Sequence, residues 1–411
     1  MSPDDLAVTA TKIFVAQAGG GPRPPEVTGT VIEAPLDGGS APREVPEART
    51  PQGTGILGVA VSGDVLYISA SANGPTGLFG VFRVANPPVA VAGGSSISAN
   101  RPDNGDGGAA TAAALYGAQG IAFSSTGDLF VAEAGDSRIR LVRNGIISTY
   151  AGTGACSTGS AAPSGPAKTT ALCNPGLVAV GRDGVIYAAR RGSSWIVSID
   201  PAGFVTTIAN DFPVAGLAVD TDGSVLAADA RAGRIVRIDT TGLPNATTVV
   251  ASSLGLIGGG LAVGTDGSIY FASSQTSSPT AADWRIFRLR PVPCSLARDG
   301  ASGATLEACP GSGTIGTRVV LSGRGCNYPG SDATIVFGPA FGEDSVATGT
   351  FGGAQLPPIQ VDASGAFRAE FVIPAELQPH QGAGGGEIAL GGYQFASKPA
   401  FCVVPFTVVD R

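Results

Sequence analysis

The feature that most constrains this chain is an internal repeat that runs through its first 290 residues. Each copy has an apolar run, a short turn that contains glycine in all copies but the first, and then further runs in which apolar and polar residues alternate. The copies begin at Leu6, Gly58, Gly120, Leu177, Gly216 and Gly260. Self-similarity of this kind predicts a repeat architecture.

The turn inside the copies predicts a tight hairpin. It reads Ser-Gly-Asp, Thr-Gly-Asp, Arg-Asp-Gly or Thr-Asp-Gly, and Gly and Asp tolerate the positive φ that such turns need. Each copy is therefore expected to form a small antiparallel sheet, which cannot bury both of its faces alone. Stacking such sheets around an axis protects the faces and leaves only short edges, so six copies predict an all-β, six-bladed β-propeller.

One stretch carries a specific family resemblance. The segments "GDGGAATAAAL", "QGIAF", "GDLFVAEAGDSRIRLV" and "GIISTYAGTG" follow one another from Gly105. Together they resemble an NHL-repeat blade, whose pattern has Gly-Asp-Gly-Gly-Pro-Ala-Thr, a strand ending in Val-Ala-Asp, an Asn-Arg-Ile-Arg strand and a final Ala-Gly-x-Gly. The resemblance is strong from Gly105 to Arg290 and weak before Gly58, and it implies a scaffold that can host unrelated functions.

The Gly-Asp-Gly-Gly segment could be a metal or phosphate loop through Asp106, or only a turn. Setting Leu115 against Leu172 aligns Asp106 with Pro163 and keeps a glycine at the position of Gly108. A ligand-binding loop would not be expected to exchange its only acid for proline. We interpret the segment as a turn and a short helical crossing into the next inner strand.

An insertion separates the third and fourth copies. From Ile121 to Val178 is 57 residues and from Val178 to Leu217 is 39, so about 18 residues are added near "ACSTGSAAPSGPAKTTALC". Cys156 and Cys173 lie at its two ends. A disulfide between them would close this loop for roughly 3 kcal/mol in the chain-entropy model.

The last quarter of the chain has a different pattern. The propeller pattern stops after Arg290 at a connection rich in Pro, Gly and Ser, "PVPCSLARDGASGATLEACPGSG". The short alternating runs that follow are divided by Gly and Pro, which predicts a β-sandwich. The "VDASGAF" hairpin and the closing "FTVV" resemble bacterial immunoglobulin-like domains. We therefore expect a propeller over 1–293 and an Ig-like domain over 294–411. The pairing of its four cysteines stays open: Cys294, Cys309, Cys326 and Cys402.

Charge and cysteine content limit the partners and the compartment. The net charge is −7 and the basic residues are scattered, which disfavours nucleic acid and anionic membranes. No apolar run is long enough for a transmembrane helix. An even number of cysteines without metal-ligand spacing favours an exported protein, secreted or at the cell surface, whose signal peptide has been removed.

The position that closes the second strand of each copy is the candidate site on the propeller. The candidates in this column are Gln17, Glu133, Arg190 and Asp229, and Ala70 and Ser273 fill the other two copies. NHL repeats commonly carry Asp in this column. We expect a structural ion pair or a solvated edge here, with a ligand-binding site as the alternative.

Catalysis is constrained by a scarcity of histidine. The chain has one His, His380, outside the repeats, and propeller lyases of the amidating and streptogramin types use His from several blades. We therefore expect no catalytic residue and no metal site, although carboxylates can bind Ca²⁺ in lactonase-like and sugar-dehydrogenase-like propellers.

These observations favour an exported, non-catalytic binding or adhesion protein. The longest loops, 95–117 and 153–175, should present one face to a protein or a cell-surface glycan. The alternatives are a Ca²⁺-dependent lactonase- or lyase-like enzyme and a self-associating structural subunit of a cell-surface assembly.

Overall fold

The computed structural model describes residues 3–17, 29–37, 39–51, 54–72, 79–94, 105–156, 163–238, 240, 247–274, 276 and 283–289, and beyond them the backbone of strands β25–β34. It divides into two compact units, Met1–Arg290 and Pro291–Arg411. Among the described residues, no helix has the length and apolar character that a membrane crossing requires.

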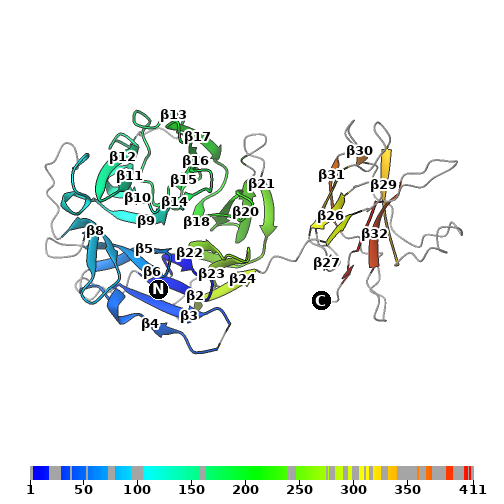
Figure 1. Ribbon diagram of the computed structural model, residues 1–411, viewed down its shortest axis with the longest axis horizontal. Coiled ribbons are helices and arrows are strands. Elements are labelled where there is room, and N and C mark those ends of the chain that lie inside the picture. Colours follow the sequence, from blue (N-terminus) through cyan, green and yellow to red (C-terminus); the bar gives the residue numbers. More distant parts are fainter. Residues whose placement is uncertain are drawn as a thin grey trace, which may run out of the picture. The chain divides into compact units, whose positions relative to one another are not determined.

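The first unit is a six-bladed β-propeller, as the repeat predicts (Figure 1). Each blade begins with its inner strand: β1 (Asp5–Val8), β5 (Thr54–Ser62), β9 (Ala118–Phe123), β14 (Leu177–Val180), β18 (Val214–Val219) and β22 (Leu256–Val263). The second strands are β2 (Lys12–Gln17), β6 (Val65–Ala72), β10 (Leu129–Glu133), β15 (Ile186–Ala189), β19 (Val225–Asp229) and β23 (Ile269–Ser274).

The outer strands complete the antiparallel sheets. The third strands are β3 (Thr30–Pro35), β7 (Phe79–Arg83), β11 (Arg138–Arg143), β16 (Ile196–Ile199), β20 (Arg234–Ile238) and β24 (Arg285–Leu289). The fourth strands are β4 (Arg43–Glu44), β8 (Val89–Gly94), β12 (Ile146–Ala151), β17 (Phe204–Ala209) and β21 (Thr247–Ala251). The described part of the last blade has three strands, and the fourth blade gains a fifth, β13 (Gly165–Pro166), from the insertion.

Turn chemistry follows the prediction. The glycine of each predicted hairpin turn has a positive φ: Gly63, Gly127, Gly184, Gly223 and Gly267. In the Asp-Gly turns the preceding aspartate accepts a hydrogen bond from the backbone two residues on, as in Val185 N to Asp183 Oδ1 at 3.2 Å. The alanine-rich segment before β9 contains the 3₁₀ turn η2 (Ala110–Ala112), which confirms the short helical crossing.

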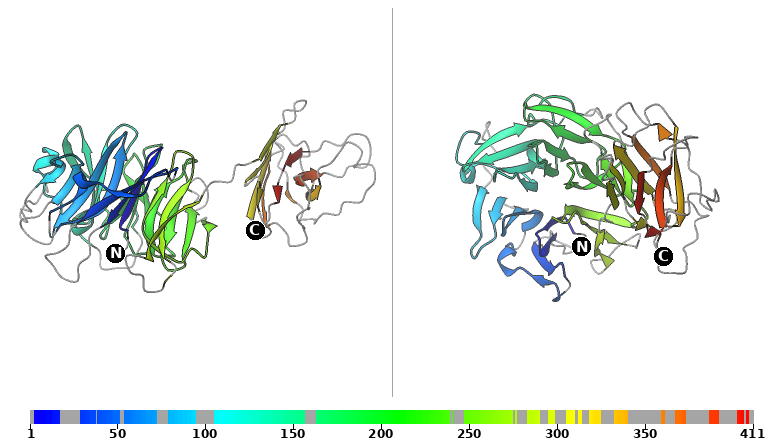
Figure 2. Two further views of the ribbon diagram at one scale, coloured as in Figure 1. Left: turned by 90° about the horizontal axis from the view of Figure 1, so that it is seen from below. Right: turned by 45° about the vertical axis from the view of Figure 1, so that its right-hand side comes forward.

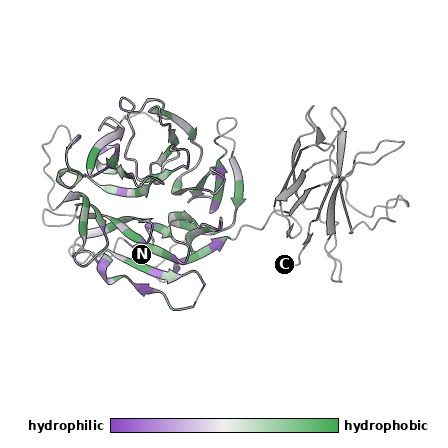
Figure 3. Ribbon diagram, viewed as in Figure 1, coloured by the Kyte–Doolittle hydropathy of each residue, from purple (hydrophilic) through white to green (hydrophobic). Residues whose placement is uncertain are grey.

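A hydrophobic cluster lies between each pair of neighbouring blades, and green strands in Figure 3 show this apolar content. The cluster that joins the last blade to the first includes Tyr270 with Leu6, Ile13 and Val15. The first blade has four strands of its own, so the ring closes by contact of β1 with β22 and not by an exchanged strand among the described residues. Figure 2 shows the blades from two further directions.

Glycine allows the inner strands to approach one another closely. Gly58, Gly120, Gly216 and Gly260 each begin the same run in their copies, and an added Cβ would collide with the inner strand of the next blade. At Gly120 the backbone N–H donates to Gly176 O at 3.1 Å, so this contact includes a hydrogen bond between blades. Leu177 and Asp5 hold the corresponding positions of the two remaining blades.

The insertion is tied down as predicted. Cys156 and Cys173 form a disulfide. Between them, Gly165–Pro166 pairs with β17, and the buried side chains of Ala167 and Leu172 enter the cluster between the third and fourth blades. The second half of the insertion is therefore part of the core.

The second unit contains two four-stranded antiparallel sheets. One has the order β25-β26-β28-β31, formed by Ser295–Arg298, Thr305–Cys309, Arg318–Arg324 and Phe367–Val372. The other has the order β30-β29-β32-β33, formed by Ile359–Gln360, Asp332–Pro339, Gly386–Gly391 and Cys402–Pro405. A parallel pair joins β27 (Ser312–Gly313) to β34 (Thr407–Val408).

The Ig-like assignment and the cysteine pairing of this unit stay predictions. Cys294, Cys326 and His380 lie outside the described residues, and the side chains of Cys309 and Cys402 are not described.

The glycine contacts predict that Gly120→Ala destabilises the propeller. The new methyl group would lie 2.9 Å from Gly176 O and 3.0 Å from Val178 N, and these backbone atoms can yield only if β9 and β14 separate. We expect a loss of about 1–3 kcal/mol in the free energy of unfolding, measured by chemical denaturation. Gly94→Ala is the control, since its nearest neighbour is Thr111 O at 3.4 Å; equal losses in the two variants would contradict the prediction.

Candidate functional site

The four candidate residues of the second-strand column do not form one site. Glu133 and Asp229 end β10 and β19 and are buried, Gln17 ends β2 and is partly buried, and Arg190 follows β15 and is exposed. The nearest described polar contact of the Arg190 side chain is with Cys173 Sγ at 3.7 Å. The structure places these residues at comparable strand ends, but the described contacts of the two carboxylates lie within their own blades.

Glu133 belongs to a buried ion triad. Its Oε2 lies 3.0 Å from Nη1 of the fully buried Arg140, and its Oε1 accepts a hydrogen bond from Tyr116 N. Arg140 Nη2 lies 2.5 Å from Asp106 Oδ1. The triad holds the predicted turn at Asp106 against β11, so both carboxylates are used in positioning the third blade.

Electrostatics agrees with this structural role for Asp106. Burial acts to raise the pKa of the Asp106 carboxyl, but hydrogen bonds from Thr149 and the charge of Arg140 outweigh it, so the pKa lies below its usual range. Asp106 is therefore ionised at neutral pH.

Asp229 is likewise satisfied within its own blade. Its Oδ2 accepts from Arg234 Nε at 2.9 Å, and its Oδ1 accepts from the backbone N–H groups of Arg231 and Ala232 at 3.1 and 3.0 Å. Among the described residues, no three His, Cys, Asp or Glu side chains come together as metal ligands would.

A different polar cluster lies where the inner strands begin. We define the axial cluster as Asp5, Gln119 and Arg191. Asp5 is the first residue of β1 and stands where four other copies have glycine, so its side chain meets the next blade. Asp5 Oδ2 accepts a hydrogen bond from Val59 N on β5 at 3.0 Å, and Oδ1 accepts one from Leu6 N at 2.9 Å.

The carboxyl group of Asp5 has a pKa that is raised toward neutral pH. Burial raises the pKa of its carboxyl to about 6, although the charge of Arg191 and the hydrogen bonds from Val59 and Leu6 oppose the rise. Asp5 therefore exchanges its proton close to neutral pH.

Arg191 connects the fourth blade to the fifth and sixth. Its Nη1 donates a hydrogen bond to Ala215 O on β18 at 3.2 Å. The same nitrogen packs against Gly259 of β22, and a Cβ added to Gly259 would collide with this nitrogen and with Asp4 O. Trp284 packs against the adjacent Gly258.

Gln119 contributes from the third blade. Its Oε1 lies 2.5 Å from the place that a Cβ of Gly176 would occupy, and Arg191 Cβ is also close to that place. The axial cluster thus brings together side chains from the first, third and fourth blades, and its contacts reach the other three.

The sequence comparison of second-strand ends missed this cluster. Asp5 and Gln119 lie at the start of inner strands, a column that was not compared, and Arg191 is one residue beyond the predicted Arg190. The signal that could have found Asp5 is its place in a column of glycines, because a residue that breaks a repeat's local rule often has a functional role.

Comparisons with known proteins give structural likeness only. No protein-family model and no curated protein matches the chain. Virginiamycin B lyase from Staphylococcus aureus is 16% identical, with 75% of this chain and 92% of that chain covered and a TM-score of 0.43. The PQQ-bound aldose sugar dehydrogenase from Streptomyces coelicolor is also 16% identical, with 70% of this chain and 94% of that chain covered and a TM-score of 0.45.

The calcium-binding protein regucalcin from Agrobacterium tumefaciens is a third similar structure, at 14% identity, 70% of this chain, 90% of that chain and a TM-score of 0.44. Because these identities and TM-scores are low, the propeller assignment rests on this chain's own strands and contacts. Nothing about activity is taken from these proteins.

The buried triad predicts a large stability cost for Arg140→Met, which leaves Glu133 buried without its counter-charge. We expect a loss of about 3–5 kcal/mol in the free energy of unfolding, and partial recovery when Glu133→Gln is added. Arg143→Ala is the control: Arg143 pairs with Asp128 at 2.7 Å, but its side chain is 61% exposed, so the loss should stay below about 1 kcal/mol. Equal losses at the two arginines would contradict the prediction that the buried triad makes the larger contribution to stability.

Proposed function

We propose that the propeller is an enzyme that hydrolyses a small polar ester or lactone at the axial cluster. The observation that carries this proposal is a carboxyl group, Asp5, with a pKa of about 6 beside a guanidinium group near the propeller axis. A general base works best when its pKa lies near the working pH, and perturbed carboxyl groups with a specific charge partner are typical of active sites. This favours an enzyme over a non-catalytic protein, whereas the enzyme alternative of the sequence analysis was Ca²⁺-dependent.

The residues of the axial cluster suggest separate roles. Ionised Asp5 would accept a proton from water as the water oxygen attacks the carbonyl carbon, and would return that proton to the departing alkoxide. Arg191 would stabilise the negative charge that develops on the carbonyl oxygen. Gln119, with both an amide donor and an acceptor, would orient the substrate.

Histidine-dependent elimination is not part of the proposal, because the repeats contain no His. The proposed reaction does not use calcium, which would be required only by the Ca²⁺-dependent alternative of the sequence analysis. In that form the carboxylates at the start of β1 would be its ligands, and the positive charge of Arg191 beside Asp5 opposes such binding.

Export and the role of the second unit complete the proposal. Disulfides form and persist in oxidising compartments, and Cys156 is bonded to Cys173, so we propose that the protein is secreted or cell-surface exposed. We propose an Ig-like fold for the second unit, which would serve as a spacer or a second contact surface. We also propose that the first unit is related to NHL-repeat propellers, on the basis of its blade motifs.

Binding without catalysis is the second candidate function. It is favoured by the insertion before the fourth blade, because a disulfide and buried side chains fix its described second half to the propeller, and recognition loops are carried on such a fixed scaffold. The partner in that case would be a protein or a glycan.

The enzyme proposal predicts hydrolysis of members of a panel of γ-lactones, δ-lactones and aryl esters, followed by pH-stat titration. Asp5→Asn should lower kcat/KM by about a hundredfold or more, and Arg191→Gln should also lower it. Because the base acts in its ionised form, kcat/KM of the unaltered protein should rise as the pH rises through about 6.

Asp222→Asn, in an exposed turn, is the matched control and should keep full activity. Circular dichroism would check that each variant is folded. Metal analysis of the purified protein would separate the calcium form from the metal-free form. Absence of turnover over the panel, or full activity in folded Asp5→Asn, would overturn the proposal in favour of binding.

A further inference from the structure

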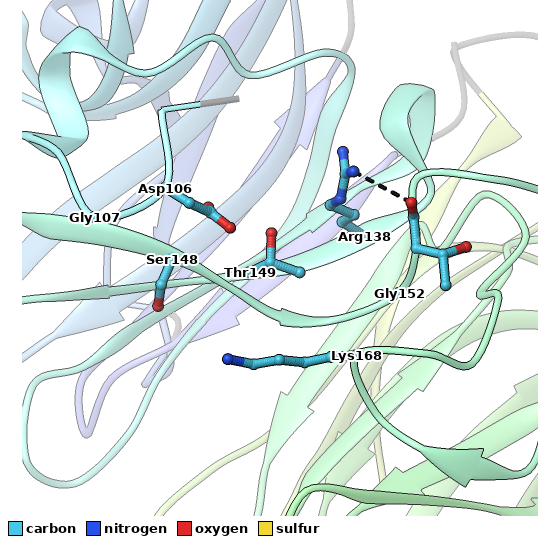
Figure 4. Close-up of a pocket in the computed structure, with 8 residues that line it drawn as sticks. Asp106, Gly107, Arg138, Ser148, Thr149, Gly152 and Lys168 are labelled. Atoms are coloured by element: carbon cyan, nitrogen blue, oxygen red, sulfur yellow. Dashed lines mark hydrogen bonds between the residues drawn. The ribbon is translucent and has the colours of Figure 1, made fainter. Parts of the chain in front are cut away.

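A cavity of about 540 Å³ lies beside the insertion, separate from the axial cluster. It is formed where the turn at Asp106, the strand β12 and the segment after β13 come together (Figure 4). The described parts of both long loops named in the sequence analysis therefore contribute to one hollow. A volume of this size accommodates a small molecule rather than a bare ion.

The lining residues are polar, charged or glycine. Apart from two glycines, the residues that line the cavity are Asp106, Arg138, Ser148, Thr149, Thr153 and Lys168. No large apolar or aromatic side chain is among them. Such a lining disfavours lipids and aromatic compounds and favours a ligand that carries hydroxyl groups over most of its surface.

The charged side chains of the cavity are not all paired. Asp106 is paired with Arg140, and Arg138 contacts the carboxylate of Asp136 and donates to Thr153 O at 3.2 Å. The side chain of Lys168 is exposed, and its ammonium group makes no salt bridge or hydrogen bond within the described part of the chain. Lys168 is thus the lining cation without a partner among the described residues, and it can pair with a ligand that carries a single negative charge.

The backbone at Lys168 is held firmly. The preceding residue, Ala167, is buried, its carbonyl accepts from Gly152 N at 2.8 Å, and its N–H donates to Gly203 O at 2.8 Å. The disulfide at Cys173 fixes the same segment further along. In Figure 4 the Lys168 side chain extends along the hollow toward Ser148.

We propose that this cavity binds a uronate, a sugar that carries one carboxylate and several hydroxyl groups. Lys168 pairs with the carboxylate, and the hydroxyl groups of Ser148, Thr149 and Thr153 exchange hydrogen bonds with those of the sugar. The same chemistry fits a free sugar acid and a uronate unit of a polysaccharide. The proposal does not depend on the hydrolase activity, because it uses none of the residues of the axial cluster.

Isothermal titration of the full chain with galacturonate tests the proposal. We expect saturable binding that Lys168→Ala weakens by about tenfold or more, as expected for loss of a charge-assisted hydrogen bond, and that Lys168→Arg largely preserves. Added salt should weaken the binding. Lys12→Ala, which removes a lysine from the first blade, should leave the affinity unchanged.

Galactose, which lacks the carboxylate, is the matched ligand control and should bind at least about tenfold more weakly. A trimer of galacturonate distinguishes the two sources: tighter binding than the monomer supports a polysaccharide unit, and equal binding per site supports a free sugar acid. Absence of saturable galacturonate binding, equal affinity for galactose, or an unchanged affinity in folded Lys168→Ala would overturn the proposal.

Discussion

The close approach of the inner strands is the contact on which the propeller depends. Glycine begins this strand's run in four of the blades, and at each of these positions the next blade's backbone or Cβ occupies the space that a side chain would need. Sheets that meet this closely near the axis diverge outward, and the wedge between them is filled by the clusters of Val, Ile, Ala and aromatic residues. The axial glycines and the wider apolar columns are therefore two parts of one packing solution.

Asp5 is the polar exception within this contact. Its carboxylate accepts a hydrogen bond from Val59 N, which joins the first blade to the second. The same position withdraws the carboxyl from water and raises its pKa to about 6. One substitution in the repeat thus both joins two blades and creates an ionisable group near neutrality.

The sequence could predict what depends on local chemistry. Hairpin turns with Gly or Asp, alternating strands and the cysteine pair at the ends of one insertion are all encoded within short segments, and they were predicted at the right places. The site depends on where the ring brings distant segments together. Asp5 meets Val59 across 54 residues, and Arg191 reaches Gly259 only because the blades close, so comparing one strand position along the repeats could not find them.

The pairing of charges separates structural groups from candidate functional ones. In the third and fifth blades, the carboxylates of Glu133 and Asp229 are met by Arg140 and Arg234 of the same blade, within a few residues of sequence. An ion pair this local can form as soon as its own sheet forms, so it serves the blade. Asp5 and Arg191 interact across the ring, and Lys168 is held at the edge of a polar hollow without a counter-charge among the described residues. Charges that the blades leave uncompensated are the ones free to interact with a ligand, which is why the two proposed sites lie where local pairing stops.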